Sequence, residues 1–296
     1  MTAKSKAEGA LLATTLVWGG TFVVVKVGME DISPITLILV RFVLAGALYL
    51  VFFGKRLFPI SWDAIRKASL LTLFLAIGFM AQNFGLTITT ASKSAFITSM
   101  MVIFVPILQV LIERKIPRLG NIVGVLVVSA GLWLLTSPEG SSFNIGDALN
   151  LACAVSFALY IVYLDIVSQT IGAEQLSFLQ AASMVVYTGL AVALFETPRF
   201  VISSRSLLSM AYLTFLATVV TMYVQTRYQK DTTPTRAVII FSIEPVFASI
   251  AAYGVLGEQL GVPGIIGGGL ILGGVLLSEL SDSIPFLKKT PRLSEP

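Results

Sequence analysis

Apolar runs long enough to cross a lipid bilayer follow one another along almost the whole chain. A helix needs about 20 apolar residues to span the hydrocarbon core. The runs that reach or approach this length are residues 9–28, 34–53, 68–88, 94–112, 119–136, 147–167, 175–195, 207–227, 235–256 and 262–280. Because the connections are short, the sequence predicts an all-α integral membrane protein with ten transmembrane helices and no separate soluble domain.

Composition supports this class and excludes several functions. Only 12% of the 296 residues are charged, against ~25% in soluble domains. The net charge of +4 comes from short basic clusters, which gives no support for a nucleic-acid partner. The chain has one cysteine, Cys153, and no histidine. Without a phosphate-binding Gly-Lys-Ser/Thr loop or a Cys/His cluster, we expect no enzyme activity, no cofactor and no metal site.

Basic residues fall mainly on one side of the predicted membrane. With the N-terminus inside, the inner segments carry thirteen lysines and arginines, and the outer segments carry four, Lys26, Lys93, Arg199 and Arg205. The positive-inside rule then predicts that both termini are cytoplasmic. We expect the protein to lie in a bacterial inner membrane. The first run, which follows Lys4 and Lys6, is interpreted as an uncleaved transmembrane helix and not as a signal peptide.

The two halves of the chain match each other in register. The matches at an offset of 139 residues are Lys26 with Asp165, Leu37 with Leu176 and Arg41 with Gln180. The matches at an offset of 143 are Thr90 with Thr233, Lys93 with Arg236, Gly124 with Gly267 and Gly131 with Gly274. Chance similarity is the alternative, but several of these matched residues are polar or glycine. Because each half has an odd number of helices, the sequence predicts an inverted repeat with a binding site near the midplane.

The predicted units are a first five-helix repeat over residues 1–137, a second over 142–280 and a cytoplasmic tail over 281–296. Four glycines spaced in pairs, Gly120 with Gly124 and Gly269 with Gly273, allow close helix contact. That contact lies either within one chain or at a homodimer seam. The sequence therefore leaves monomer and homodimer open.

Both halves of the chain carry recognisable motifs. The first two helices contain Trp18-Gly19-Gly20-Thr21-Phe22, Lys26, Ser33-Pro34 and Arg41-Phe42, and the ninth runs from Ala237 through Glu244-Pro245 to Gly257-Glu258. In this order they resemble the EamA family of the drug/metabolite transporter superfamily. The resemblance extends from about Ala10 to Leu280. It implies ten helices, both termini inside, and movement of small metabolites by alternating access. The first half departs from the family pattern, because no glycine precedes Glu113-Arg114-Lys115.

Glu244 is the deepest acidic residue, and Pro245 follows it directly. A carboxylate at the centre of a membrane helix costs about 2.5–3.5 kcal/mol on insertion scales. Proline removes a backbone donor, so we expect the ninth helix to be interrupted here, as in a transport path. Both are tolerated where they face protein or a water-filled cavity. Glu244 is therefore either a site for proton coupling or for a substrate ammonium, or a structural carboxylate capped by a neighbouring helix.

Further candidates lie on helices that would line such a cavity. The amides can bind a zwitterion or join helices, and the aromatic rings can stack on substrate or pack in the core. The predicted substrate-binding residues are Trp18, Phe22, Gln82, Asn83, Phe96, Ser99, Tyr160, Tyr223, Gln225 and Glu244. The predicted gating or structural charges are Lys26, Arg41, Lys93 and Arg236. For Arg41 a structural cation is favoured over a partner for a substrate carboxylate, and for the others an interfacial anchor is favoured.

The sequence thus favours an exporter of small amphipathic metabolites, above all aromatic or hydrophobic amino acids, that is either proton-coupled or facilitative. Its expected partners are this small-molecule substrate and the lipid bilayer. A nucleotide-sugar or phosphorylated-metabolite exchanger would need several cations in the cavity, where only Arg41 is deep enough. A lipid flippase would need a lateral opening. Export over import is implied only by the family resemblance.

Overall fold

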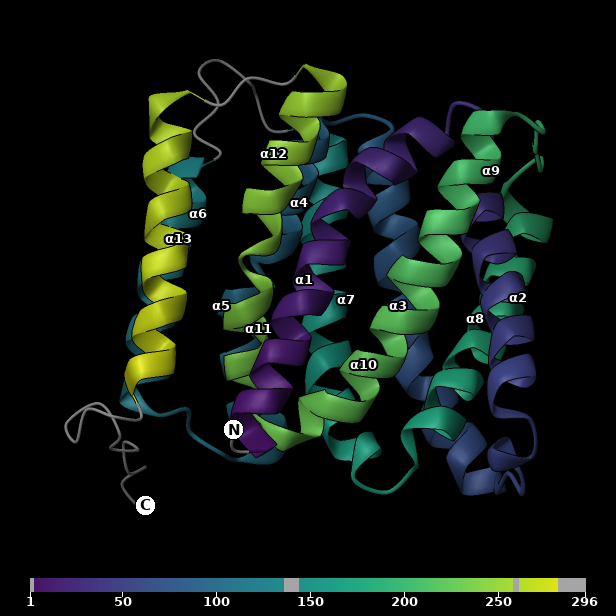
Figure 1. Cartoon of the computed structure of the whole chain (residues 1–296), viewed down its shortest axis with the longest axis horizontal. Helices are drawn as coiled ribbons and strands as arrows, with labels where there is room; N and C mark the ends of the chain where they lie inside the picture. The colour runs from purple at the N-terminus through teal and green to yellow at the C-terminus, as the bar shows by residue number, and fades with distance from the viewer. Residues whose placement is uncertain (1–2, 136–143, 258–260, 282–296) are drawn as a thin grey trace.

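The computed structural model describes residues 3–135, 144–257 and 261–281, and these form a bundle of ten membrane-spanning segments (Figure 1). The first half contains α1 (Ala3–Gly28), α2 (Pro34–Phe53), η1 (Gly54–Leu57), α3 (Trp62–Leu86), α4 (Ala91–Ser99), α5 (Met101–Glu113) and α6 (Leu119–Leu135). The second half contains α7 (Ile145–Ser168), α8 (Ala173–Phe195), α9 (Ser204–Ala211), η2 (Tyr212–Val220), α10 (Thr221–Tyr228), η3 (Gln229–Asp231), α11 (Pro234–Phe241), α12 (Glu244–Leu256) and α13 (Val262–Leu280).

All ten predicted spans are helical, which confirms the fold class. Eight segments of the described chain are long and apolar enough to cross a membrane, and α6 and α13 are shorter apolar helices. The predicted starts are the least accurate part. Helix α3 begins at Trp62 and not at residue 68. The Ser61 side chain accepts a hydrogen bond from the Ala64 amide at 3.1 Å and so caps a start that includes the charged Asp63, Arg66 and Lys67.

The fourth and ninth spans are each interrupted near their middle. α4 gives way to α5 at Met100, and α11 gives way to α12 at Ser242 and Ile243. At both interruptions the chain tightens into hydrogen bonds three residues back, from the Met100 amide to Ile97 and from the Ile243 amide to Ile240. The sequence predicted only the second interruption, beside Pro245. The first lies at the repeat-equivalent position, 143 residues earlier, and has no adjacent proline.

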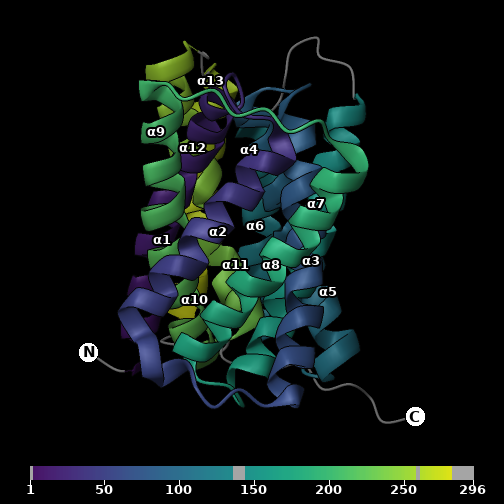
Figure 2. The same cartoon turned by 90° about the vertical axis from the view of Figure 1, so that its right-hand side faces the viewer.

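Successive spans alternate in direction, so that α1 begins and α13 ends at the same end of the bundle (Figures 1 and 2). We call this the terminal end and the other the opposite end. Because α7 starts at the opposite end, the second half has the inverse orientation of the first. The two halves are therefore inverted five-helix repeats, as predicted.

The last helices of the two repeats, α6 and α13, pack against each other at one side of the bundle (Figure 1). A Cβ added at Gly131 would lie 2.7 Å from the Gly267 carbonyl oxygen, and one at Gly124 would lie 3.2 Å from that of Gly274. These four glycines are the two predicted repeat pairs, now crossed over one another. Close packing at Gly124 is thus within the chain, whereas nothing lies within 4 Å of a Cβ at Gly269.

Helices α2 and α8 join the two repeats at both ends of the bundle. At the opposite end the Glu196 carboxylate accepts hydrogen bonds from the Ile35 and Thr36 amides at 2.8 and 2.7 Å, which caps α2. At the terminal end the Gln175 side-chain amide donates to the carbonyl oxygens of Leu57 and Pro59 at 2.7 and 2.8 Å. Hydrogen bonds thus connect the two repeats at both ends of this helix pair.

Candidate functional site

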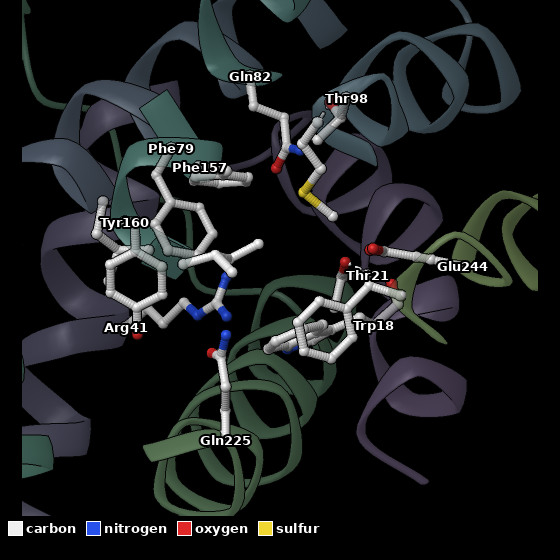
Figure 3. A pocket seen from close by; sticks show the side chains of 14 residues that line it. Trp18, Thr21, Arg41, Phe79, Gln82, Thr98, Phe157, Tyr160, Gln225 and Glu244 are labelled. Carbon is white, nitrogen blue, oxygen red and sulfur yellow. Dashed lines mark hydrogen bonds between the residues drawn. The ribbon is translucent and has the colours of Figure 1, made fainter. Parts of the chain in front are cut away.

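A cavity lies between the two repeats, midway along the helices, with about 570 Å³ of space that no protein atom occupies. Figure 3 shows its lining. The lining side chains are Trp18, Thr21, Arg41, Leu75, Phe79, Gln82, Thr98, Met101, Phe157, Tyr160, Ile161, Gln225, Phe241 and Glu244.

The repeat symmetry extends into this lining. Ten of the fourteen residues form equivalent pairs under the two offsets found in the sequence, so the cavity lies on the axis that relates the repeats. The pairs at an offset of 139 are Trp18 with Phe157 and Thr21 with Tyr160, and those at 143 are Gln82 with Gln225, Thr98 with Phe241 and Met101 with Glu244. The charges break this symmetry, because Glu244 is matched with Met101 and Arg41 with Gln180.

The Trp18-Gly19-Gly20-Thr21 motif sets the position of α1 against the second repeat. A Cβ at Gly19 would overlap Phe247 of α12, so glycine permits the close approach. The Trp18 indole N–H donates to the Thr221 hydroxyl at 3.1 Å, and its ring meets Phe241 edge to face at 5.2 Å. These contacts hold Trp18 in the cavity wall beside the interruption between α11 and α12.

Arg41 is buried and is held by the π-helical segment η2. Its Nε donates to the Thr218 hydroxyl and its Nη2 donates to the Ala217 carbonyl oxygen at 2.7 Å. Its guanidinium lies 5.0 Å from the centre of the Phe79 ring. A π-helix shifts the backbone pairing by one residue and leaves carbonyls for such partners. Arg41 therefore joins α2 to the second repeat through a hydroxyl and a carbonyl, while it also faces the cavity.

Glu244 is the first residue of α12, directly after the interruption, and only 8% of its surface is exposed. The first turn of a helix presents unpaired backbone N–H groups and positive dipole charge, which stabilise a carboxylate there. Figure 3 shows Arg41 and Glu244 on different sides of the cavity, with both side chains directed inward. The cavity therefore presents a cation and a carboxylate to the same space.

Two amides and a group of rings complete the wall. Gln82 donates to the Thr98 hydroxyl at 3.3 Å, and Gln225 donates to the Gln229 side chain at 2.9 Å. The rings of Phe79 and Phe157 pack edge to face at 5.5 Å. The wall is thus mainly aromatic and apolar, with a few fixed polar groups, as is typical of small-molecule sites.

Five of the predicted binding residues and one predicted charge line the cavity: Trp18, Gln82, Tyr160, Gln225, Glu244 and Arg41. The other predicted binding residues are not part of its lining. Asn83 donates to the Pro34 carbonyl oxygen at 3.0 Å. Tyr223 stacks on Phe53 at 5.3 Å and donates to Glu174 at 3.5 Å. The side chains of Phe22 and Ser99 are buried among helices, and that of Phe96 packs against the core. Neighbours on a helix face directions ~100° apart, so Gln82 and Asn83 cannot both face the cavity directly. The sequence does not say which of the two directions is the cavity side.

The other predicted charges lie toward the two ends of the bundle, away from the cavity lining. Lys26 donates to the Thr89 carbonyl oxygen at 3.2 Å. Lys93 forms an ion pair with Asp147 at 2.6 Å, and Arg236 forms one with Glu8. The anchor interpretation for Lys93 and Arg236 did not foresee these buried acidic partners.

Sequence reasoning left several lining residues unassigned: Thr21, Leu75, Phe79, Met101, Phe157, Ile161 and Phe241. The repeat would have found some of them. Phe157 and Met101 are the equivalents of the predicted Trp18 and Glu244, so transferring each candidate to the other repeat adds true cavity residues.

The EamA-like transporter family matches residues 5–137 and, a second time, residues 144–280. The chain belongs to the EamA-like transporter family. This EamA-like protein is therefore a multi-pass membrane transporter, and not an enzyme. It is 31% identical over 274 residues to an uncharacterized transporter of Archaeoglobus fulgidus, with 93% of this chain and 86% of that protein covered.

A second relative is the uncharacterized inner membrane transporter YedA of Escherichia coli, which is 26% identical over 280 residues. That match covers 92% of this EamA-like chain and 90% of YedA. A solved crystal structure with 17% identity superposes with a TM-score of 0.77 and covers 94% of this chain and 97% of the other. At this identity the likeness concerns the fold alone, which it shares almost from end to end.

Proposed function

We propose that this EamA-like transporter moves amino acids with apolar or aromatic side chains out of the cytoplasm, across the bacterial inner membrane, by alternating access. The observation that carries the proposal is the charge arrangement of the central cavity. Among the fourteen described lining residues, Arg41 is the cation and Glu244 is the carboxylate. They are directed into one space from different sides (Figure 3).

A zwitterion matches this arrangement group by group. Its carboxylate would be bound by Arg41, whose planar fork of donors suits a carboxylate, and its ammonium by Glu244. The amides of Gln82 and Gln225 add neutral hydrogen-bonding groups on two further sides. An apolar side chain would pack against Trp18 and the rings opposite it.

A phosphorylated or nucleotide-sugar substrate fits less well. Such anions carry more negative charge than Arg41 alone can balance, and Glu244 would repel them. A lipid flippase would need a cavity that accepts acyl chains, whereas this one places Arg41 and Glu244 among its lining side chains. The proposal also places the terminal end in the cytoplasm, and ten described lysines and arginines of the predicted inner segments support this location.

Counterflow in proteoliposomes tests the proposal. Vesicles loaded with an unlabelled amino acid should accumulate the labelled one, while nucleotide sugars and lipids should not exchange. Glu244→Gln should reduce the counterflow of apolar amino acids by about tenfold or more, because a buried charged hydrogen bond contributes ~1.5–3 kcal/mol. Asp63→Asn is the matched control, since Asp63 is exposed in the first turn of α3, and should leave counterflow unchanged.

Exchange of nucleotide sugars without exchange of amino acids would refute the substrate class. The same vesicles separate proton coupling from facilitated movement. If a pH gradient leaves the net amino-acid flux of the wild-type transporter unchanged, Glu244 has no coupling role.

A further inference from the structure

Two buried ion pairs connect the repeats, one near each end of the bundle. At the terminal end Arg236 of α11 pairs with Glu8 of α1, and their side chains are 4% and 11% exposed. At the opposite end Lys93 of α4 pairs with Asp147 of α7 at 2.6 Å, with exposures of 17% and 0%. Each pair thus joins an interrupted span of one repeat to the first helix of the other.

The repeat offsets convert one ion pair into the other. Arg236 follows Lys93 by 143 residues, and Asp147 follows Glu8 by 139. The match includes the surrounding threonines. The hydroxyls of Thr89 and Thr232, which are also 143 apart, donate to Asp147 at 3.1 Å and to Glu8 at 3.5 Å. The next residues, Thr90 and Thr233, cap α4 and α11 in the same way. The same polar contact therefore occurs once near each end of the bundle, in opposite orientations.

The ninth span passes two hollow regions, and Arg236 and Phe241 each line one of them. A second cavity, with about 870 Å³ of unoccupied space, lies at the terminal end and is lined by Arg236 together with Lys4, Lys115 and Lys230. Phe241, five residues further along the ninth span, lines the central cavity. Five helical residues span about 7.5 Å. Lys93 and Thr98 have the same spacing at the opposite end.

Each cation is carried on a short helical segment that ends at an interruption. Met100 lies seven residues after Lys93, and Ile243 lies seven residues after Arg236. Such interruptions are places where backbone angles can change with little loss of helical hydrogen bonding. α4 and α11 can therefore move while α5 and α12 stay packed.

We propose that the Arg236–Glu8 pair and the Lys93–Asp147 pair are the two gates of the transport path. Transport opens one gate while the other stays formed, and both are formed in the structure described here. Glu8 and Asp147 thereby become functional residues of the transporter. The proposal rests on the alternating-access part of the proposed function but not on the identity of the substrate.

Thiol labelling without substrate tests this. A cysteine is placed in the central cavity as Thr21→Cys, in a Cys153→Ser background that removes the one native, buried cysteine. A membrane-impermeant maleimide is added to vesicles of either orientation, with the side of the terminal end fixed by proteolysis of an N-terminal tag. Glu8→Gln should raise labelling from the terminal side about tenfold, which corresponds to 1.4 kcal/mol. Asp147→Asn should raise it from the opposite side.

The exchanged pair, Glu8→Arg with Arg236→Glu, restores the ion pair and should return labelling to the wild-type rate. This rescue shows that raised labelling of Glu8→Gln comes from the lost ion pair and not from misfolding. Asp63→Asn removes a carboxylate from the exposed Asp63–Lys67 pair and should change nothing. The proposal is overturned if folded Glu8→Gln and Asp147→Asn proteins are labelled from the same side, or at the wild-type rate. Because no substrate is present, failure of the amino-acid proposal in counterflow leaves this result readable.

Discussion

The contact between α6 and α13 allows a sharp prediction for the substitution Gly131→Ala. The new Cβ would lie 2.7 Å from the Gly267 carbonyl oxygen, 2.8 Å from the Ile271 amide nitrogen and 2.9 Å from the Leu270 Cβ. Two of these atoms belong to the backbone and the third is fixed to it, so no side-chain rotation relieves the overlap. The two helices must separate.

The size of the effect follows from these distances. Carbon atoms in optimal contact are about 3.5–4.0 Å apart, so α13 must move by at least about 0.6 Å. A gap of that size removes about a quarter of the van der Waals attraction of each separated atom pair. Overpacking a close interface typically costs about 1–3 kcal/mol. The helix propensity of alanine returns about 0.5–1 kcal/mol. We expect a net loss of about 1–2 kcal/mol.

Thermal unfolding of the purified transporter in detergent measures this loss. The expected fall in Tm is about 2–6 °C. Gly269→Ala is the matched control on the partner helix, because nothing lies within 4 Å of its added Cβ, and its Tm should stay level or rise. A Gly131→Ala protein as stable as Gly269→Ala would refute the packing argument.

Three further substitutions have defined outcomes. Gly19→Ala should push α12 away from α1 beside Glu244 and lower counterflow more than it lowers Tm, since the added Cβ overlaps Phe247. Glu196→Gln should cost about 1 kcal/mol of stability, seen as a lower Tm with counterflow retained, because the α2 cap loses its charge. Arg41→Lys keeps the charge but cannot bind both Thr218 and Ala217, so we expect a rise in the apparent KM for amino acids.

The sequence predicted the fold well because one physical rule dominates it. Hydrocarbon excludes unpaired backbone groups, so each long apolar run must be a helix, and all ten were found. The interruption at Met100 was missed, because a neighbouring proline was the only signal sought. The equivalent interruption beside Pro245 was expected, and the 143-residue offset leads directly from one to the other.

The site was predicted only in part, because a buried helix in a bundle is apolar on several faces. Glu244 and Gln82 stood out as polar residues in apolar runs, and they do face the cavity. Asn83 stood out equally and serves as a link to α2. The partners of the end charges were beyond reach, since choosing Glu8 for Arg236 requires knowing that α1 lies beside α11.

The ion pairs near the two ends follow the repeat symmetry of the chain, whereas the charges of the central cavity do not. The two buried ion pairs near the ends are duplicated, acid for acid and base for base, at Glu8 with Asp147 and at Lys93 with Arg236. Two conformations that exchange must be close in free energy, and under the proposed gating the matched ion pairs at the two ends keep them so. The cavity charges are not duplicated. A symmetric cavity would offer a substrate two equal poses, whereas one cation and one carboxylate fix a single orientation of a polar cargo.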